Sequence, residues 1–166
     1  PNKGMTELLT ACRQLKNDAV PFTLVIAGKE QTEGEYLPEF HNGLGENFEY
    51  AGLVSGRRKC DFLRSLDAFV LPSYFEGLPM SLLETMSYGT TPIVTPVGSI
   101  PQVVKSGVNG IFINHHDCES IVEAIKQVNE DRSLLRRLGE EARKTIFNEF
   151  NSYIHPHSVK KIKMDG

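Results

Sequence analysis

The sequence is poor in the features that mark secreted, membrane-spanning and metal-bound proteins. Its 166 residues include three cysteines, which are widely separated and form no Cys-x-x-Cys pair, so neither a disulfide framework nor a zinc site is indicated. Apolar runs reach about six residues, whereas a membrane-spanning helix needs roughly 20. There is no Asp-x-Asp sequence. We therefore expect a cytoplasmic protein with reduced thiols.

Charge and composition lie near the globular average. The net charge is −3, so no strong basic field recruits nucleic acid. The chain is 40% hydrophobic and 23% charged, which excludes a disordered chain or a collagen-like repeat. Its length suits one domain that can bury a sizeable core without stabilisation by disulfides or metal ions.

Apolar periodicity alternates between strand and helix patterns along almost the whole chain. Short apolar runs ended by glycine or proline predict strands, and apolar residues at helical spacing predict helices. Strands are expected at 22–27, 48–53, 68–71, 92–95 and 110–113. Helices are expected at 3–16, 35–42, 57–66, 79–88, 99–105, 119–128 and 133–150, with a loop at 29–34. The alternation favours an α/β fold, a Rossmann-like parallel sheet with helices on both faces.

The start of the chain does not fit this fold completely. Residues 1–150 are expected to form one domain and residues 151–166 a C-terminal tail or crossover segment. The chain opens with a helix, although the first strand of a doubly wound sheet is normally central. Without that strand, its two neighbours would expose unpaired backbone groups. We expect either residues before Pro1 that supply it, or a sheet that splits or closes by self-association.

The most informative stretch is 72–84, which follows a predicted strand and opens a predicted helix. Ligands of open α/β sheets bind at such turns, outside the carboxyl ends of the strands. Gly77 allows close backbone approach, and Pro79 suits the first helical turn. The free amides around 80–82 would point outward at the positive end of the helix dipole. Together these features predict a phosphate site.

Two glutamates bracket this predicted site. Glu76 precedes the helix and Glu84 lies more than one turn inside it, so they can reach opposite ends of an extended ligand. A nucleotide diphosphate sugar has hydroxyls at both ends and a diphosphate between them, to which Lys3 would add positive charge. The alternative is that Glu76 is a solvated loop residue and Glu84 an exposed helix residue, because glutamates eight apart are common.

Other charged clusters have simpler interpretations. The basic run 57–59 opens a helix near the predicted site, and one of its side chains is a candidate for a diphosphate contact. The run 115–117, His-His-Asp, favours a turn over a metal site. The basic end at 160–163 favours a solvated face over contact with an anionic membrane or a partner domain.

In the stretch 72–84 the sequence resembles the retaining family 4 glycosyltransferases, which have the GT-B fold. Glu76 and Glu84 match the E-x7-E motif of that family. Further matching segments follow in order along the chain, at 3–4, 24–28, 52–54, 67–73, 89–95 and 107–110. The resemblance therefore implies the C-terminal, nucleotide-sugar-binding half of such an enzyme.

The resemblance also implies a role for each matching position. Glu76 would be the catalytic residue at the donor sugar, and Glu84 would hold the ribose. Lys3 would contact the phosphates, and Val54 would contact the base through its backbone. The donor-binding segment between the glutamates would comprise Gly77, Leu78, Pro79, Met80, Ser81 and Leu82. The family needs no metal or other cofactor, since the nucleotide diphosphate sugar is its substrate.

The implied activity is transfer of a sugar to an acceptor with retained anomeric configuration, in polysaccharide or glycoconjugate biosynthesis. The acceptor pocket would come from an N-terminal domain, so this chain alone is expected to bind donor weakly and not turn over. The implied location is cytoplasmic, with peripheral membrane contact through the full-length protein. Two alternatives stay open: another GT-B enzyme, such as a nucleotide-sugar epimerase or a phosphorylase, and a non-catalytic α/β assembly or regulatory module.

Overall fold

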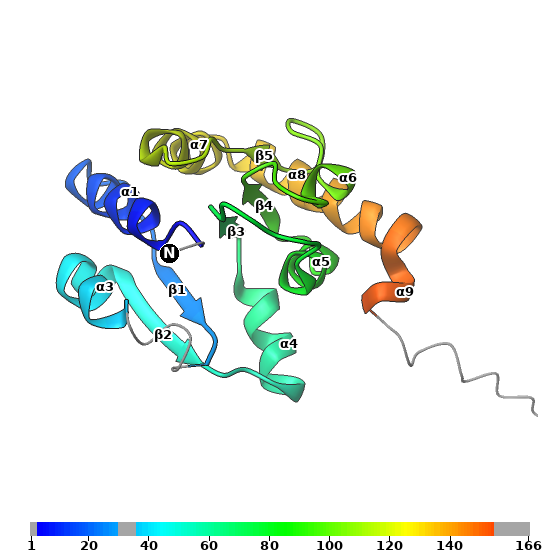
Figure 1. Cartoon of the computed structure of the whole chain (residues 1–166), viewed down its shortest axis with the longest axis horizontal. Helices are drawn as coiled ribbons and strands as arrows, with labels where there is room; N and C mark the ends of the chain where they lie inside the picture. The colour runs from blue at the N-terminus through cyan, green and yellow to red at the C-terminus, as the bar shows by residue number, and fades with distance from the viewer. Residues whose placement is uncertain (1–2, 30–35, 155–166) are drawn as a thin grey trace, which may run out of the picture.

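The computed structural model describes residues 3–29 and 36–154, and in this part of the chain parallel strands alternate with helices (Figure 1). The strands are β1 (Leu24–Ala27), β2 (Phe48–Gly52), β3 (Ala68–Leu71), β4 (Thr91–Val94) and β5 (Ile111–Phe112). The α-helices are α1 (Met5–Asn17), α3 (Leu37–Leu44), α4 (Gly56–Ser65), α5 (Met80–Ser87), α6 (Ile100–Val103), α7 (Cys118–Glu130), α8 (Arg132–Thr145) and α9 (Asn151–Ile154). A 3-10 turn, η1 (Gly45–Asn47), and a π-helical turn, η2 (Ile146–Phe150), complete the order. The predicted α/β fold is confirmed.

Local chemistry explains where several of these elements begin and end. The carboxylate of Asp117 accepts hydrogen bonds from the amides of Glu119 and Ser120, which caps α7, and Asp131 caps α8 in the same way. The helix expected at 133–150 is α8 continued by η2, and α9 then packs against α5. The strand expected at 110–113 is only two residues long. From residue 30 onward, the loop expected at 29–34 lies outside the described residues.

Helices cover both faces of the sheet that contains β4. Ile93 packs in a core cluster formed with α1, α3 and α7, whereas the next residue, Val94, packs in a second cluster with α5, α6 and α8. Neighbouring strand residues point to opposite faces, so an apolar strand such as β4 needs cover on both sides. Ile93 and Val94 are both fully buried, as that arrangement requires.

The strands do not form one continuous sheet. β1 pairs with β2, and β3, β4 and β5 form a second parallel sheet in that order. Within the described residues, the edges of β1 and β3 that face each other have no strand partner. Of the outcomes expected, the described residues show a sheet split beside β1, in which no described strand takes the central position.

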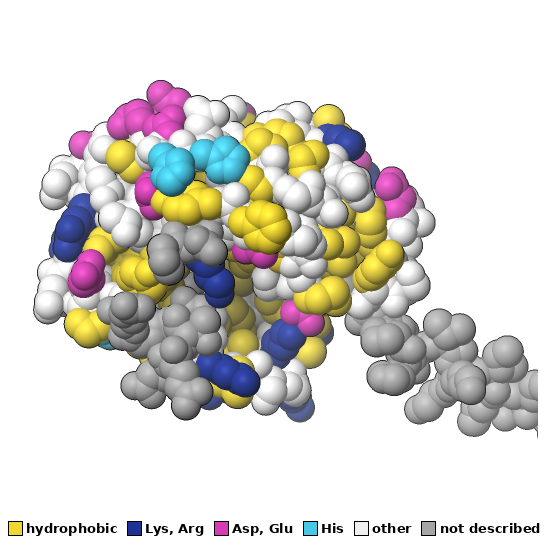
Figure 2. All heavy atoms as spheres, viewed as in Figure 1, with side chains coloured by type: hydrophobic (Ala, Val, Ile, Leu, Met, Phe, Trp, Pro, Cys, Tyr) yellow, Lys and Arg dark blue, Asp and Glu magenta, His cyan; other side chains and the backbone are white. Residues whose placement is uncertain are grey.

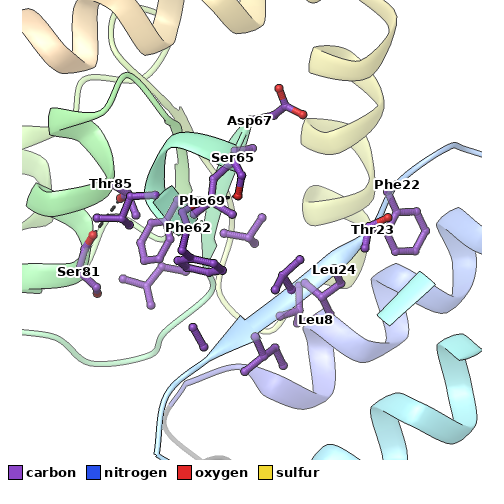
Figure 3. Close-up of a pocket in the computed structure, with 18 of the residues that line it drawn as sticks. Leu8, Phe22, Thr23, Leu24, Phe62, Ser65, Asp67, Phe69, Ser81 and Thr85 are labelled. Carbon is purple, nitrogen blue, oxygen red and sulfur yellow. Dashed lines mark hydrogen bonds between the residues drawn. The ribbon is translucent and has the colours of Figure 1, made fainter. Parts of the chain in front are cut away.

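A cavity of about 690 Å³ occupies the space between β1 and β3. Figure 2 shows that the surface is hollowed there, and Figure 3 shows the apolar side chains that line the interior. Both strands line it along their full length, together with Leu8 of α1, Phe62 of α4 and Val128 of α7. Its charged lining residues include Lys3, Lys59 and Glu84, and, before the amino end of β3, Asp67 with its ion-pair partner Arg132.

Candidate functional site

The loop after β3 is held against the sheet by a chain of hydroxyl groups. The Thr95 hydroxyl, which follows β4, donates a hydrogen bond to the carbonyl oxygen of Ser73. The buried Ser73 hydroxyl in turn donates to Oε1 of Glu76 at 2.7 Å. The Glu76 carboxylate is therefore oriented by the end of β3, which argues against a freely solvated loop residue.

A second loop packs directly on the backbone of Glu76 and Gly77. The Ser99 amide donates to the Gly77 carbonyl at 3.1 Å. Gly98 has a φ of +55°, and a Cβ added to it would lie 1.8 Å from the Glu76 carbonyl oxygen. Only glycine fits this position without displacing the Glu76 backbone. A Cβ added to Gly77 would meet no atom within 4 Å, so the space beside that residue is open.

The first turn of α5 differs from the sequence-based prediction in two details. Pro79 is the N-cap, with extended backbone, and the helix begins at Met80. Of the three amides predicted to be free at 80–82, the Leu82 amide is engaged, because it donates to the Pro79 carbonyl at 3.1 Å. This bond between residues three apart satisfies a backbone N–H that would have no partner at the start of an ideal α-helix. The prediction for Leu82 is therefore wrong, while those for Met80 and Ser81 remain.

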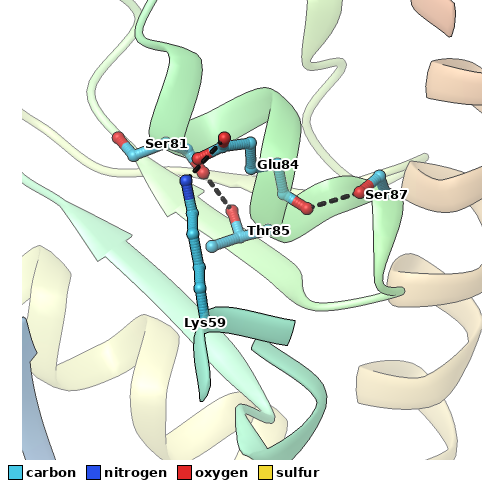
Figure 4. A network of polar contacts seen from close by, with 5 residues as sticks. All are labelled: Lys59, Ser81, Glu84, Thr85 and Ser87. Carbon is cyan, nitrogen blue, oxygen red and sulfur yellow. Dashed lines mark hydrogen bonds and ion pairs between the residues drawn. The ribbon is translucent and has the colours of Figure 1, made fainter. Parts of the chain in front are cut away.

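Glu84 lies one turn inside α5 and forms an ion pair with Lys59 of α4. Nζ of Lys59 lies 2.7 Å from Oε1 of Glu84 (Figure 4). The two side chains are 37% and 31% exposed, so the pair is partly shielded from water. The interpretation of Glu84 as an exposed, solvated helix residue is wrong. Both residues line the cavity.

The Lys3-Gly4 segment lies against the carboxyl end of β3. Gly4 has a φ of +65°, and a Cβ there would lie 2.1 Å from the Pro72 carbonyl oxygen. The Gly4 carbonyl accepts the Leu8 amide at 3.0 Å, so α1 starts at this turn. The close approach to Pro72 fixes the start of α1 beside the loop that leads to Glu76.

The cavity brings together four of the residues predicted from the sequence. Lys3, Val54, Ser81 and Glu84 all line it, although they come from three segments of the chain. Glu76, Gly77, Leu78, Pro79, Met80 and Leu82 are not in its lining but belong to the adjoining loop and helix start. With Lys59, which also lines the cavity, these residues bring two cations and one carboxylate together beside the start of α5.

A cluster of Glu7, Tyr74 and His116 next to this opening was not predicted. The rings of Tyr74 and His116 lie 4.1 Å apart, and Nδ1 of His116 lies 3.6 Å from Oε1 of Glu7. Burial and hydrogen bonding with Glu7 raise the pKa of Tyr74 to about 12. Burial raises the pKa of Glu7, but hydrogen bonding with Tyr74 and the nearby His116 outweigh it and lower the pKa. Only the fold shows these contacts, because the three residues lie far apart in sequence.

The run His115-His116-Asp117 forms a turn, as expected, and Asp117 is occupied as a helix cap. Across the described ranges, no group of three or more His, Cys, Asp or Glu side chains is arranged to hold a metal ion. No helix there is both long and apolar enough to cross a bilayer.

The model of one protein family, the group 1 glycosyl transferases, matches residues 1–145. The chain belongs to this family. The prediction of a glycosyltransferase domain is thereby confirmed at the level of the family, and the expected C-terminal half of a GT-B enzyme is confirmed as the fold.

Individual group 1 glycosyltransferases and solved structures agree with this assignment. A UDP-Gal:alpha-D-GlcNAc-diphosphoundecaprenol alpha-1,3-galactosyltransferase of Escherichia coli is 31% identical over 105 residues, which are 63% of this chain and 27% of that protein. The C-terminal domain of LpcC from Francisella tularensis superposes with a TM-score of 0.78 at 19% identity, covering 90% of this chain and 80% of that one. HepE from Anabaena, in complex with UDP-glucose, gives a TM-score of 0.76 at 20% identity, covering 89% of this chain and 41% of that one.

The chain spans only part of the curated relatives that it matches, for example 27%, 33% and 39% of three of them. The matched portion of this chain contains the whole of the site described above, from Lys3 to Ser99.

Proposed function

We propose that this chain is the donor-binding part of a retaining family 4 glycosyltransferase and binds a nucleotide diphosphate sugar at the opening of the cavity. The observation that carries the proposal is the convergence of Lys3, Val54 and Glu84 on one opening, beside the start of α5 and Glu76. Ligands bind at this edge of open α/β sheets. The UDP-glucose complex of a protein with the same fold supports the substrate class.

Each group has a distinct task in this proposal. The Glu84 carboxylate accepts hydrogen bonds from the ribose diol, and the Val54 backbone contacts the base. The free amides of Met80 and Ser81, the helix dipole and Lys3 meet the diphosphate. When the bond between the anomeric carbon and the diphosphate oxygen breaks, negative charge develops on that oxygen. The same groups then stabilise the leaving diphosphate.

Glu76 lies at the sugar end of the proposed site and acts there as the catalytic carboxylate. Ser73 holds its Oε1, which leaves the other oxygen able to accept a hydrogen bond from a sugar hydroxyl. The acceptor pocket is proposed to lie on an N-terminal domain, so the chain alone binds donor without turning over. We propose a cytoplasmic enzyme with peripheral membrane contact through its full-length form.

A thermal-shift screen of the purified protein against UDP-, GDP- and ADP-sugars tests this function. A nucleotide sugar at 100 times its dissociation constant adds roughly 2.7 kcal/mol to stability, which raises Tm by about 5–10 °C for a chain of this size. Glu84→Ala should lose most of the shift. Glu141→Ala, on α8 and outside the cavity lining, is the control and should retain it. A wild-type protein that no nucleotide sugar stabilises would favour the non-catalytic module instead.

A further inference from the structure

Lys59 connects two helices at the opening of the cavity. It lies on α4, and its ammonium reaches Oε1 of Glu84 on α5 at 2.7 Å, as Figure 4 shows. Both side chains line the cavity, and the backbone of the Glu84 turn is itself fixed, since the Ser87 hydroxyl donates to the Glu84 carbonyl at 2.6 Å. Lys59 thus contacts the carboxylate itself, while Ser87 contacts the backbone of the same residue.

The pair changes what Glu84 can offer to a ligand. A carboxylate has two oxygens that accept hydrogen bonds, and Lys59 occupies Oε1, so Oε2 remains for a hydroxyl donor. A partly exposed ion pair adds little to stability, and ordering a long lysine side chain costs entropy. The pair is therefore better explained by its position at the opening than by its contribution to folding.

We propose that Lys59 is a positioning residue for the ribose contact: it holds the Glu84 carboxylate toward the cavity. This inference rests on the function proposed above, in which Glu84 binds the ribose diol. It assigns to Lys59 an effect that passes through Glu84, and it excludes a direct phosphate contact as the main role.

The test compares Lys59→Met with the wild type by calorimetric titration of the full-length protein. The probes are UDP, ADP and GDP, and the 2′,3′-dideoxy form of the one that binds most tightly. We expect Lys59→Met to weaken binding of the ribose form about two- to fivefold, the range for a partly exposed ion pair. Binding of the dideoxy form should not change, because it has no diol for Glu84 to hold.

Two further variants isolate the pair. In a Glu84→Gln background, Lys59→Met should have no added effect, since residues that act through one contact are not additive. Lys144→Met removes a lysine of similar geometry, 2.6 Å from Glu141 on α8, and should leave binding unchanged. Lys59→Gln serves as a second variant if Lys59→Met does not fold.

The outcomes separate this inference from the proposed function. If the wild type binds none of the three nucleotides, or binds ribose and dideoxy forms equally, the proposed function fails and this inference fails with it. If the wild type prefers the ribose form and Lys59→Met behaves like the wild type, only this inference is overturned. Equal weakening of both forms would indicate a direct phosphate contact and would also overturn it.

Discussion

The hydroxyl of Ser73 and the carboxylate of Glu76 form a hydrogen bond of 2.7 Å at the carboxyl end of β3. Because Ser73 is buried and its own carbonyl accepts a hydrogen bond from Thr95, the bond connects the glutamate to the sheet. The side chain that we propose to act at the donor sugar is thereby oriented before any ligand arrives, which reduces the ordering cost of binding.

Ser73→Ala removes the donor that orients Glu76. We expect affinity for the nucleoside diphosphate to be retained, while the additional affinity contributed by the sugar falls by roughly 0.5–1.5 kcal/mol, the net value of one hydrogen bond. Calorimetric titration with UDP and with UDP-glucose measures the two separately. An equal loss for both compounds would show that Ser73 supports the whole site and not Glu76 in particular.

Gly98→Ala should be strongly destabilising. The new Cβ would lie 1.8 Å from the Glu76 carbonyl, and the φ of +55° adds strain. Strain of about 1–2 kcal/mol and overpacking of about 1–3 kcal/mol combine at this position. Gly107→Ala is the matched control, because its φ is +79° but no atom lies within 4 Å of its Cβ position. Urea unfolding should show a clearly larger loss for Gly98→Ala, and equal losses would contradict the packing described here.

Cys12 should resist thiol reagents in the folded protein. Burial raises its pKa to about 12, so at pH 8 only about one molecule in ten thousand carries the reactive thiolate. Its thiolate population, and with it any reactivity, should rise only as pH approaches that value. Cys60 and Cys118, which are both half-buried, should react before Cys12 at pH 8. Mass spectrometry after brief exposure to a maleimide measures the labelling of each cysteine, and equal labelling of Cys12 would contradict its burial in α1.

Nucleotide binding should persist in a chelator. The sequence has no Asp-x-Asp, and the proposed site meets the diphosphate with backbone amides, Lys3 and a helix dipole. We expect the dissociation constant of the tightest-binding nucleoside diphosphate to be the same with EDTA as with added Mg²⁺. Loss of binding in EDTA, restored by Mg²⁺, would show that a metal ion belongs to the site.

The sequence predicted the order and type of most elements because their local signals are strong. The helix expected at 119–128 forms and is capped by Asp117, and the apolar run around Ile93 forms a buried strand. The split beside β1 was one of the outcomes expected, since the first strand of a doubly wound sheet is normally central. The boundaries of the elements were less predictable. A strand was expected at 110–113, but β5 has two residues because its length depends on pairing with β4 and not on apolar content.

The sequence predicted those site residues that lie in one continuous stretch of the chain. Glu76, Glu84 and the start of α5 lie within nine residues of each other, so spacing alone relates them. The contacts that position them were missed, because Ser73 meets Thr95 across 22 residues and Lys59 meets Glu84 across 25. Spacing also could not show that the Leu82 amide is used by the Pro79 carbonyl.

The most direct test of the central claim is a crystal structure of the protein with a bound nucleoside diphosphate, obtained with the compound that binds most tightly among UDP, ADP and GDP. We predict the diphosphate at the amides of Met80 and Ser81 and the ribose hydroxyls at Glu84, each at about 3 Å between heavy atoms. A nucleotide bound elsewhere, or one whose ribose points away from Glu84, would contradict the account.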